Sequence, residues 1–568
     1  MLLQKLNEYA DRLDLPPRLY TNAPVRYIIE LDGEGNFLAL TDTAGTDKTT
    51  RRGERRDVPE VVRTSGVRAF LLADKADYVL GFCGDGADPQ KVADRHAAFN
   101  EFVGRCATAT EDPRVIAVAR FLREGLSQVS VPAGFDPSAR ITFRVNDEFV
   151  IDLPEVQTFW ADSIDAEALD VPQADCIVCA RRRRVAETIE KVKGIPGGQM
   201  GGTSIISFNA AAFLSYKLES SLNAPTCESC GARFTKSLNE LLRDPAHRVI
   251  VGNVAYVFWT REPKAKFSFA TIITEPTTEL LNQLYTSVTR AREGAITALD
   301  EEEMSRFYAT ALSASGGRAV VRDWIDTTVA QAKHNLARWF ALQRIRAGAE
   351  IGDPLGLRQL AYATVRTGDR NNPPPANITR SLFRTALAGV PLPYDLLYQA
   401  VRRNRAEQSV TRQRAALIKM VLLSQRREFT QEEMVELDPA EQSAAYRCGR
   451  LLAVLEAIQR AAMPGVNATI VDRFFGTASS APASVFGRLM RGAQPHLSRL
   501  ERDRRGAWVA LQRRMEEVTD GLQTFPKTLT LEDQGIFALG YYHERHRRWA
   551  GQKDDAELDT NTTDQTEE

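Results

Sequence analysis

Residues 176–230 read CIVCARRRRVAETIEKVKGIPGGQMGGTSIISFNAAAFLSYKLESSLNAPTCESC, with a Cys-x-x-Cys pair at each end. The two pairs are Cys176 with Cys179 and Cys227 with Cys230. Four thiolates in two close pairs match the ligand set of one tetrahedral structural zinc ion. Such an ion would fasten both ends of the intervening loop and leave no open position for catalysis. Reduced, metal-free cysteines or a disulfide are the alternatives.

The loop between the cysteine pairs is rich in Gly, Ser and Asn, so its backbone can approach a ligand closely. Its side-chain amides belong to Gln199, Asn209 and Asn223, and Lys217 adds a cation. Amide side chains can read the edges of bases. We therefore expect this loop to contact nucleic acid, with a purely structural loop as the alternative.

Three groups of arginines are candidates for contact with a nucleic-acid backbone. Arginine pairs with phosphates and stacks on bases, although runs of arginine on a solvated surface are also common. The first group, for duplex DNA, is Arg181, Arg182, Arg183 and Arg184. The second group, in a predicted N-terminal loop that competes for the same duplex, is Arg51, Arg52, Arg55 and Arg56. The third group, for a single strand, is Arg502, Arg505, Arg513 and Arg547.

Length and composition indicate a globular protein of several domains. The chain has 568 residues, of which 43% are hydrophobic and 26% are charged, with a net charge of −1. No secretory segment and no apolar run of about 20 residues is present, so we expect a cytoplasmic protein without membrane contact. Seven cysteines are few for this length and suit a reducing compartment, where Cys83, Cys106 and Cys448 are expected to be buried.

The pattern along the chain predicts an α+β fold. The N-terminal and central regions are β-rich and contain the zinc-pinned insertion with its four cysteines, and an all-α helical bundle follows them. A hairpin is predicted at residues 27–40, a second strand pair at 67–72 and 78–82, and a long helix at 324–347. The predicted parts are an N-terminal α+β domain (1–130), a central α+β domain (131–350, with the loop 176–230), a helical linker (351–430), a C-terminal bundle (431–552) and a disordered acidic tail (553–568).

Motifs for catalysis are missing from the sequence. The chain has six histidines, with no His-Asp doublet, no His-Glu-x-x-His and no Gly-x-Ser-x-Gly. The glycine-rich run before Thr203 lacks the lysine of a phosphate loop, which argues against nucleotide hydrolysis. We therefore expect no enzyme. A nuclease and a purely structural zinc-containing assembly subunit are the alternatives.

Several short motifs, in order from end to end, resemble one known family. The chain resembles the large subunit of the type I-C CRISPR Cascade complex, a crRNA-guided surveillance complex for antiviral defence. The motifs that carry the resemblance are MLLQKLNEY at 1–9, PP at 16–17, YVLG at 78–81, SFNA at 207–210, SY at 215–216, NAP at 223–225, NLARWF at 335–340, GRL at 449–451, NATI at 467–470 and QGIFALGYY at 534–542. The family often has a small residue at the position of Lys217.

The resemblance implies a DNA-binding role without chemistry of its own. It implies recognition of the PAM in double-stranded target DNA, opening of the duplex, and R-loop formation by the crRNA. The implied partners are the Cascade backbone subunits, the crRNA-processing subunit and a helicase–nuclease that cleaves the opened DNA. It also implies that the helical C-terminus is made separately from an internal start, for which Met434 is the first candidate and Met420 the second.

Overall fold

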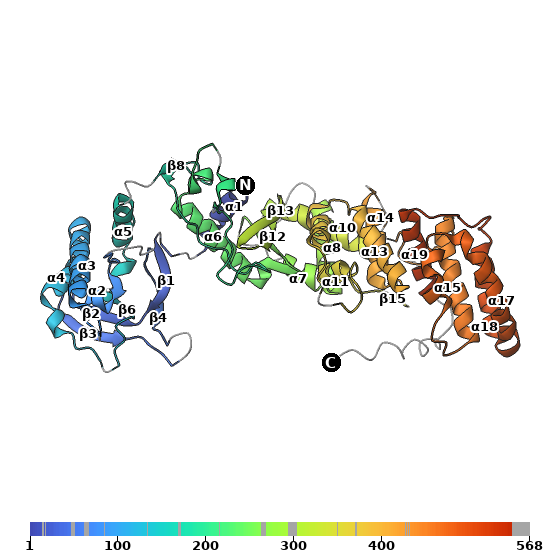
Figure 1. Cartoon of the computed structure of the whole chain (residues 1–568), viewed down its shortest axis with the longest axis horizontal. Coiled ribbons are helices and arrows are strands. Elements are labelled where there is room, and N and C mark those ends of the chain that lie inside the picture. The colour runs from blue at the N-terminus through green and yellow to red at the C-terminus, as the bar shows by residue number, and fades with distance from the viewer. Residues whose placement is uncertain are drawn as a thin grey trace. The chain divides into compact units, whose positions relative to one another are not determined.

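A computed structural model describes residues 1–568 except 14, 15, 18, 47–50, 62–66, 85, 133, 168–171, 209, 215, 263–267, 294–303, 349, 370, 371, 427, 429, 431 and 548–568. The chain forms two compact units. The N-terminal unit comprises Leu3–Ile189 and Phe208–Lys236. The C-terminal unit comprises Met1–Leu2, Glu190–Ser207 and the chain from Ser237 onward. The colours of Figure 1 follow the chain through both.

The N-terminal unit is built on a five-stranded mixed sheet of order β3-β2-β6-β5, with β7 paired to β6. Strands β2 and β3 form the predicted antiparallel hairpin, whose turn is held because the Asp32 carboxylate accepts bonds from the Glu34 and Asn36 amides. Strand β6 runs parallel to β2. A separate antiparallel ribbon pairs β1 with β4. The strands are β1 Tyr20–Val25, β2 Tyr27–Leu31, β3 Phe37–Asp42, β4 Glu54–Pro59, β5 Ala73–Lys75, β6 Arg140–Val145 and β7 Glu148–Phe149.

Helices cover this sheet and enclose an aromatic core. Helices α3 and α4 each begin with an Asp cap followed by Pro, which fixes where they start. Phe99, Phe121, Phe143 and Trp160 are fully buried between the helices and the sheet. The α-helices of this unit are α1 Leu2–Tyr9, α2 Ala76–Val79, α3 Pro89–Thr110, α4 Pro113–Glu124 and α5 Pro154–Glu167, and the 3-10 turns are η1 Ala10–Arg12, η2 Leu126–Gln128 and η3 Val150–Asp152.

Two predictions for this unit are wrong. The predicted strand pair at 67–72 and 78–82 is a short strand, β5, followed directly by helix α2. The cause is local: the Asp74 carboxylate accepts bonds from the Phe70 and Lys75 amides and bends the chain here. Cys106 is buried as predicted, and so is Cys448 of the other unit, but Cys83 is exposed.

The C-terminal unit begins with a four-stranded antiparallel sheet of order β10-β11-β12-β13. The predicted helix at 324–347 starts late, because Trp324 belongs to β13 and Thr328 caps helix α10 by accepting a bond from the Gln331 amide. The elements are β10 Arg248–Val251, β11 Val254–Thr260, α7 Phe269–Thr274, α8 Thr278–Glu293, β12 Arg306–Ser315, β13 Arg318–Thr328, α10 Val329–Gln343, β14 Arg346–Ala347 and β15 Glu350–Ile351, with η6 Pro245–His247 before β10.

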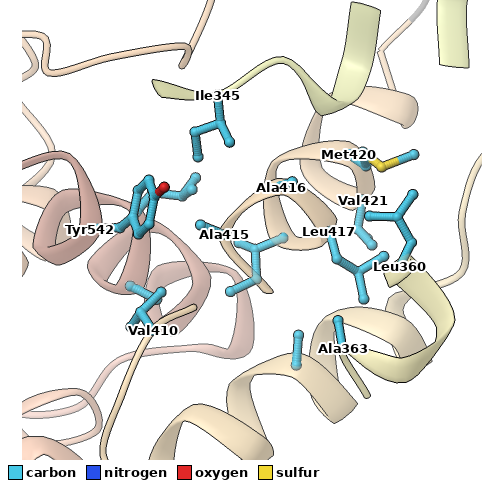
Figure 2. Close-up of a cluster of buried hydrophobic side chains, with 14 of the residues drawn as sticks. Ile345, Leu360, Ala363, Val410, Ala415, Ala416, Leu417, Met420, Val421 and Tyr542 are labelled. Carbon is cyan, nitrogen blue, oxygen red and sulfur yellow. The ribbon is translucent and has the colours of Figure 1, made fainter. Parts of the chain in front are cut away.

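In the described part of the unit, nine further α-helices share one continuous hydrophobic core with this sheet. Figure 2 shows part of it, where Leu417 and Val421 of α14 lie near Leu360 of α11, and Tyr542 of α19 lies near Ala415. The Tyr542 hydroxyl donates to the Arg346 carbonyl at 2.7 Å. The helices are α11 Leu357–Tyr362, α12 Ala376–Ala388, α13 Tyr394–Glu407, α14 Arg412–Ser424, α15 Ala444–Ala462, α16 Ile470–Ala478, α17 Phe486–Asp503, α18 Arg505–Thr519 and α19 Leu531–Arg545, with η7 Pro482–Ser484.

The α+β class is therefore confirmed, with strands in the N-terminal and central regions and helices toward the C-terminus. The predicted boundaries at 130, 350, 430 and 552 stay predictions. The acidic tail 553–568 lies outside the described residues.

Helices α15 and α19 approach each other closely through two glycines. A Cβ atom at Gly449 would lie 2.0 Å from the Phe537 carbonyl oxygen, and one at Gly540 would lie 2.2 Å from the Tyr446 carbonyl oxygen. Beside this contact the fully buried Arg450 binds Glu544, which is also fully buried, at 2.9 Å. Any side chain at either glycine would push the helices apart and strain this buried ion pair.

Gly449→Ala is therefore expected to lower the free energy of unfolding by about 1–3 kcal/mol or more. Gly492→Ala in α17 is the matched control, because no atom lies within 4 Å of its added Cβ. That change is expected to raise stability by up to about 1 kcal/mol, since alanine favours a helix over glycine. Denaturant unfolding of both variants measures the difference, and equal stabilities would contradict the close helix contact.

Lys419 is a buried cation on α14. Its side chain has no exposed surface, and its Nζ donates to the Arg344 carbonyl at 2.7 Å. Burial, together with the nearby Arg344 charge, lowers the pKa of Lys419 to about 7. The folded protein thus releases this proton near pH 7, whereas the unfolded chain keeps it until about pH 10.4. Between these values the unfolded state binds more protons, so a rise in pH favours the folded state.

Lys419→Met is expected to be more stable than the parent at pH 6, by on the order of 3 kcal/mol, because no charge is buried. The advantage is expected to shrink steadily between pH 7 and pH 10. Denaturant unfolding of both proteins across this range gives the difference directly. A difference that stays constant with pH would show that Lys419 titrates alike in both states.

Candidate metal centre and nucleic-acid-binding surfaces

The four predicted cysteine ligands come together in the N-terminal unit. Their sulfur atoms all lie within 4.8 Å of one another, and three of the four residues are buried, with Cys179 half-buried. A zinc ion with Zn–S bonds of about 2.3 Å would hold four sulfurs about 3.8 Å apart, so only a small adjustment separates this cluster from a tetrahedral site. The cysteines form no disulfide among the described residues.

Backbone hydrogen bonds bring the two cysteine pairs together. The first pair follows β8 (Gln173–Asp175), and the second lies at the start of α6 (Glu228–Arg243). The Ile177 amide donates to the Pro225 carbonyl and the Ala186 amide to the Thr226 carbonyl, both at 2.8 Å. Backbone bonds alone therefore connect two segments that lie 40 to 48 positions apart in the sequence.

Hydrogen bonds converge on the sulfur atoms of the cluster. The Cys176 sulfur accepts bonds from the Val178 amide at 3.4 Å and the Cys227 amide at 3.3 Å. A hydrogen bond from the Cys230 thiol lowers the pKa of Cys227 to about 5, and the same bond raises the pKa of Cys230. Amide donors on a sulfur and a helix N-terminus are the usual supports of metal-bound thiolates. The donor set therefore fits a soft, tetrahedral metal ion.

The arginine run lies beside this cluster. Arg182–Arg184 form strand β9, which pairs with β8. Arg181, Arg182 and Arg183 are exposed, whereas the half-buried Arg184 makes an ion pair with Glu228 of α6 at 3.4 Å. Three guanidinium groups of the run are thus presented to solvent, and the fourth ties β9 to the cysteine-bearing helix.

The loop between the cysteine pairs is not one piece, contrary to our expectation. Residues 190–207 belong to the C-terminal unit, where the Val192 and Thr203 backbones exchange two hydrogen bonds and Ser204 pairs with the edge of β13. The exposed Gln199 lies there, against Gly317. Backbone pairing fastens this half of the loop, so a metal at the cysteines would fasten only the second half.

The second half of the loop carries the remaining predicted amides. Asn209 lies outside the described residues, and Lys217 is exposed with a positive φ of 60°. The Asn223 amide nitrogen donates to the carbonyls of Leu218 and Ser220, at 2.9 and 3.1 Å. Both donor hydrogens of Asn223 therefore hold the turn at residues 218–223, which contains the 3-10 turn η5 Ser220–Asn223. A separate 3-10 turn, η4 Ala211–Phe213, precedes it.

Sequence reasoning missed the apolar surface of this segment. Tyr216 is 95% exposed, and Phe213, Leu214 and Leu218 are also exposed. Large exposed apolar side chains that gather on one segment commonly mark a contact surface. Their run in the sequence, FLSYKL, was the available signal, but a short apolar run is indistinguishable from a buried one without the fold.

The N-terminal arginine group divides in two. Arg51 and Arg52 are exposed, whereas Arg55 and Arg56 lie in strand β4 and not in a loop. Arg55 donates to the Asn22 side chain at 2.8 Å. Arg56 pairs with Asp152 at 3.0 Å and stacks on the ring of Phe149.

The C-terminal arginine group also contains both exposed members and a member paired within the protein. Arg502, Arg505 and Arg513 are exposed on α17 and α18. Arg547 is half-buried and pairs with Glu517 at 3.0 Å and with Glu544 at 3.6 Å. Its charge is neutralised within the protein, which distinguishes it from the other three.

Comparison with known protein families decides the assignment. Residues 4–549 match the family described as CRISPR-associated protein (Cas_Csd1). The chain belongs to the Cas_Csd1 family. It is therefore a large subunit of type I-C Cascade, as its motifs predicted. No curated protein matches the chain.

The family match spans both units of this Cas_Csd1 chain, including the cysteine cluster and the three arginine groups. Among the described helices, none is both long enough and apolar enough to cross a membrane. Among the described residues, the candidate arginines that are exposed and have no carboxylate partner are Arg181–Arg183, then Arg51, Arg52 and Arg55, and then Arg502, Arg505 and Arg513.

Proposed function

We propose that this subunit recognises the PAM in double-stranded DNA, promotes duplex opening and R-loop formation by the crRNA, and recruits the helicase–nuclease. The subunit itself carries no catalytic step, and it acts in the cytoplasm with the Cascade backbone and crRNA-processing subunits. The observation that carries the proposal is the exposed row Arg181–Arg183, of which Arg182 and Arg183 lie on strand β9 next to the clustered cysteines. Phosphate contacts from such a row position a duplex without reading its sequence.

A structural zinc ion at Cys176, Cys179, Cys227 and Cys230 completes this arrangement. The four sulfurs, their amide donors and their burial support zinc over an oxygen-binding cation. The ion would hold β8, β9 and the start of α6 as one rigid element. The arginine row would then keep its orientation when DNA binds.

Base reading is assigned to side-chain amides and Lys217 on the segments between the cysteine pairs. Gln199 and Lys217 are exposed, and Asn209 belongs to the same proposal. Asn223 contributes to base reading by holding the turn that follows Lys217. Arg51, Arg52 and Arg55 are the competing duplex contact, and Arg502, Arg505 and Arg513 guide the displaced strand.

The zinc proposal predicts one metal ion per chain in protein purified without chelator, measured by elemental analysis. Cys227→Ser is expected to abolish the bound metal, because it removes one of four thiolates. Cys448→Ser, at a buried cysteine far from the cluster in sequence, is the control and is expected to keep the ion. Metal-free wild-type protein with unchanged DNA binding would overturn the proposal.

The DNA proposal predicts two different mutational signatures in the assembled complex. Asn209→Ala is expected to weaken binding to PAM-bearing duplex by about 1–3 kcal/mol while PAM-less duplex is unaffected, because a base contact is lost. Arg182→Ala with Arg183→Ala is expected to weaken both duplexes equally and to reduce the log–log salt slope by about 1.8. Gel shifts over a salt series measure both effects.

Arg123→Ala, at an exposed arginine on α4, is the matched control and is expected to change neither duplex. Equal losses on both duplexes for Asn209→Ala would make that residue a backbone or folding contact. Cleavage of duplex by the chain alone with Mg²⁺ would assign it to the nucleases instead.

A further inference from the structure

A cavity of about 380 Å³ lies in the C-terminal unit, between α8, the end of α10 and the residues that follow β15. Helices α8 and α10 pack against each other (Figure 1). Thr278, Leu281, Asn282 and Tyr285 line the cavity from α8, at spacings that place them on one helix face. The volume is near the lower end of the range of about 300–1,000 Å³ for small-molecule sites, which suits a small compound and not a polymer.

One part of the cavity wall is apolar and fixed in place. Leu281, Tyr285 and Phe340 line this part, and Phe340 belongs to the hydrophobic core of the unit. The Tyr285 hydroxyl donates to the Ala337 carbonyl at 3.5 Å, which holds the tyrosine ring against α10. An apolar group of a ligand that packs against these side chains leaves water, which favours binding.

The amide of Gln343 is an unsatisfied donor that belongs to the same cavity wall. Its side chain is 3% exposed, and its Oε1 accepts a bond from the Leu355 amide at 2.6 Å. That bond fixes which end of the amide is the donor, because only the oxygen can accept. Its Nε2 is buried and has no hydrogen-bond partner among the described residues. Buried N–H groups are rarely left unpaired, so this one indicates an acceptor oxygen on a ligand.

Two opposite charges line the cavity without pairing with each other. They belong to Arg344 and Asp353. The Gly352 amide donates to the Ile345 carbonyl at 3.1 Å, and this bond joins the two segments that carry the charges. Arg344 pairs instead with the exposed Glu432 at 3.4 Å. The Asp353 carboxylate makes no ion pair or hydrogen bond within the described part of the chain.

A carboxylate near a guanidinium, with apolar side chains beside both, suits a zwitterionic ligand. An α-amino acid has its ammonium and its carboxylate on one carbon, so both reach neighbouring opposite charges at once. Arg344 and the Gln343 Nε2 donate to a carboxylate, and Asp353 accepts from an ammonium. Arg412 donates to the Asp353 carbonyl and leaves the carboxylate available. A phosphate is the weaker fit, because the Asp353 charge repels it.

We propose that this cavity binds a free α-amino acid with an apolar side chain. Arg344 and Gln343 take its carboxylate, Asp353 takes its ammonium, and its side chain packs against Tyr285 and Phe340. The site is independent of the proposed DNA contacts, because none of their residues lines the cavity. A ligand here joins α8 to α10 and to the segment after β15, so its binding stabilises the folded C-terminal unit.

The test uses the full-length chain and three probes that share one aromatic ring. They are L-phenylalanine, 3-phenylpropionate, which lacks the ammonium, and 2-phenylethylamine, which lacks the carboxylate. Isothermal titration calorimetry measures the affinity, and a rise in Tm with L-phenylalanine checks it. L-phenylalanine is expected to bind about 10- to 150-fold more tightly than either analogue, the effect of one hydrogen bond to a charged group.

Two variants remove one charge of the site each, and neither residue is buried. Asp353→Asn is expected to lose the preference for L-phenylalanine over 3-phenylpropionate. Arg344→Gln is expected to weaken L-phenylalanine about 10- to 150-fold and to leave 2-phenylethylamine unchanged. Glu279→Gln, at an exposed acid of α8 that does not line the cavity, is the matched control and is expected to keep every parental affinity.

A parent chain that binds none of the three probes at millimolar concentration overturns the proposal. Equal parental affinities for L-phenylalanine and 3-phenylpropionate also overturn it, because Asp353 would then contact no ammonium. Binding of L-phenylalanine that both Asp353→Asn and Arg344→Gln leave unchanged places the ligand elsewhere and has the same consequence.

Discussion

The candidate DNA-binding element depends on the backbone pairing between residues 177–186 and 225–227. Two amide–carbonyl bonds of 2.8 Å place one cysteine pair beside the other before any ion is considered. Backbone bonds of this kind contribute only about 1 kcal/mol each, so on their own they would not hold a Gly- and Ser-rich region. The four clustered cysteines, which could hold a metal ion, lie where these two segments meet.

Charge compensation separates structural arginines from candidates for phosphate contact. Arg56, Arg184 and Arg547 each find a carboxylate within 3.6 Å, and Arg450 is buried in an ion-pair network. Removal of one partner from such a buried network would cost several kcal/mol. These residues therefore stabilise the fold. Among the described residues, the candidates Arg181–Arg183 are exposed and have no carboxylate partner, as expected of a surface that meets a polyanion.

Local signals made much of the fold predictable. The hairpin at 27–40, the helices that begin with Asp-Pro, and the helical second half follow from turn chemistry and from 3.6-residue periodicity. The cysteine cluster followed from ligand spacing alone. These features depend on neighbours within a few residues, or on a residue type with few other uses.

Sequence reasoning could not predict interactions between residues that lie far apart in the chain. Arg56 meets Asp152, Arg547 meets Glu517, and Val192 pairs through its backbone with Thr203, and none of these pairings has a signature in the residues themselves. The halves of the loop differ for the same reason. Backbone hydrogen bonds to a sheet edge can form with any side chain, so the sequence does not reveal them. The Gly-rich composition therefore predicted one loop, whereas the structure has two segments with different attachments.

Arg233 joins the beginning of the chain to the cysteine-bearing helix. Three residues beyond Cys230, it donates to the Asn7 carbonyl at 2.8 Å and pairs with Asp11. The first residues of the chain are thus anchored to the helix that supplies half of the sulfur ligands. Truncation of residues 3–11 would take away these partners of Arg233 and would loosen the helix that carries Cys230 in its first turn.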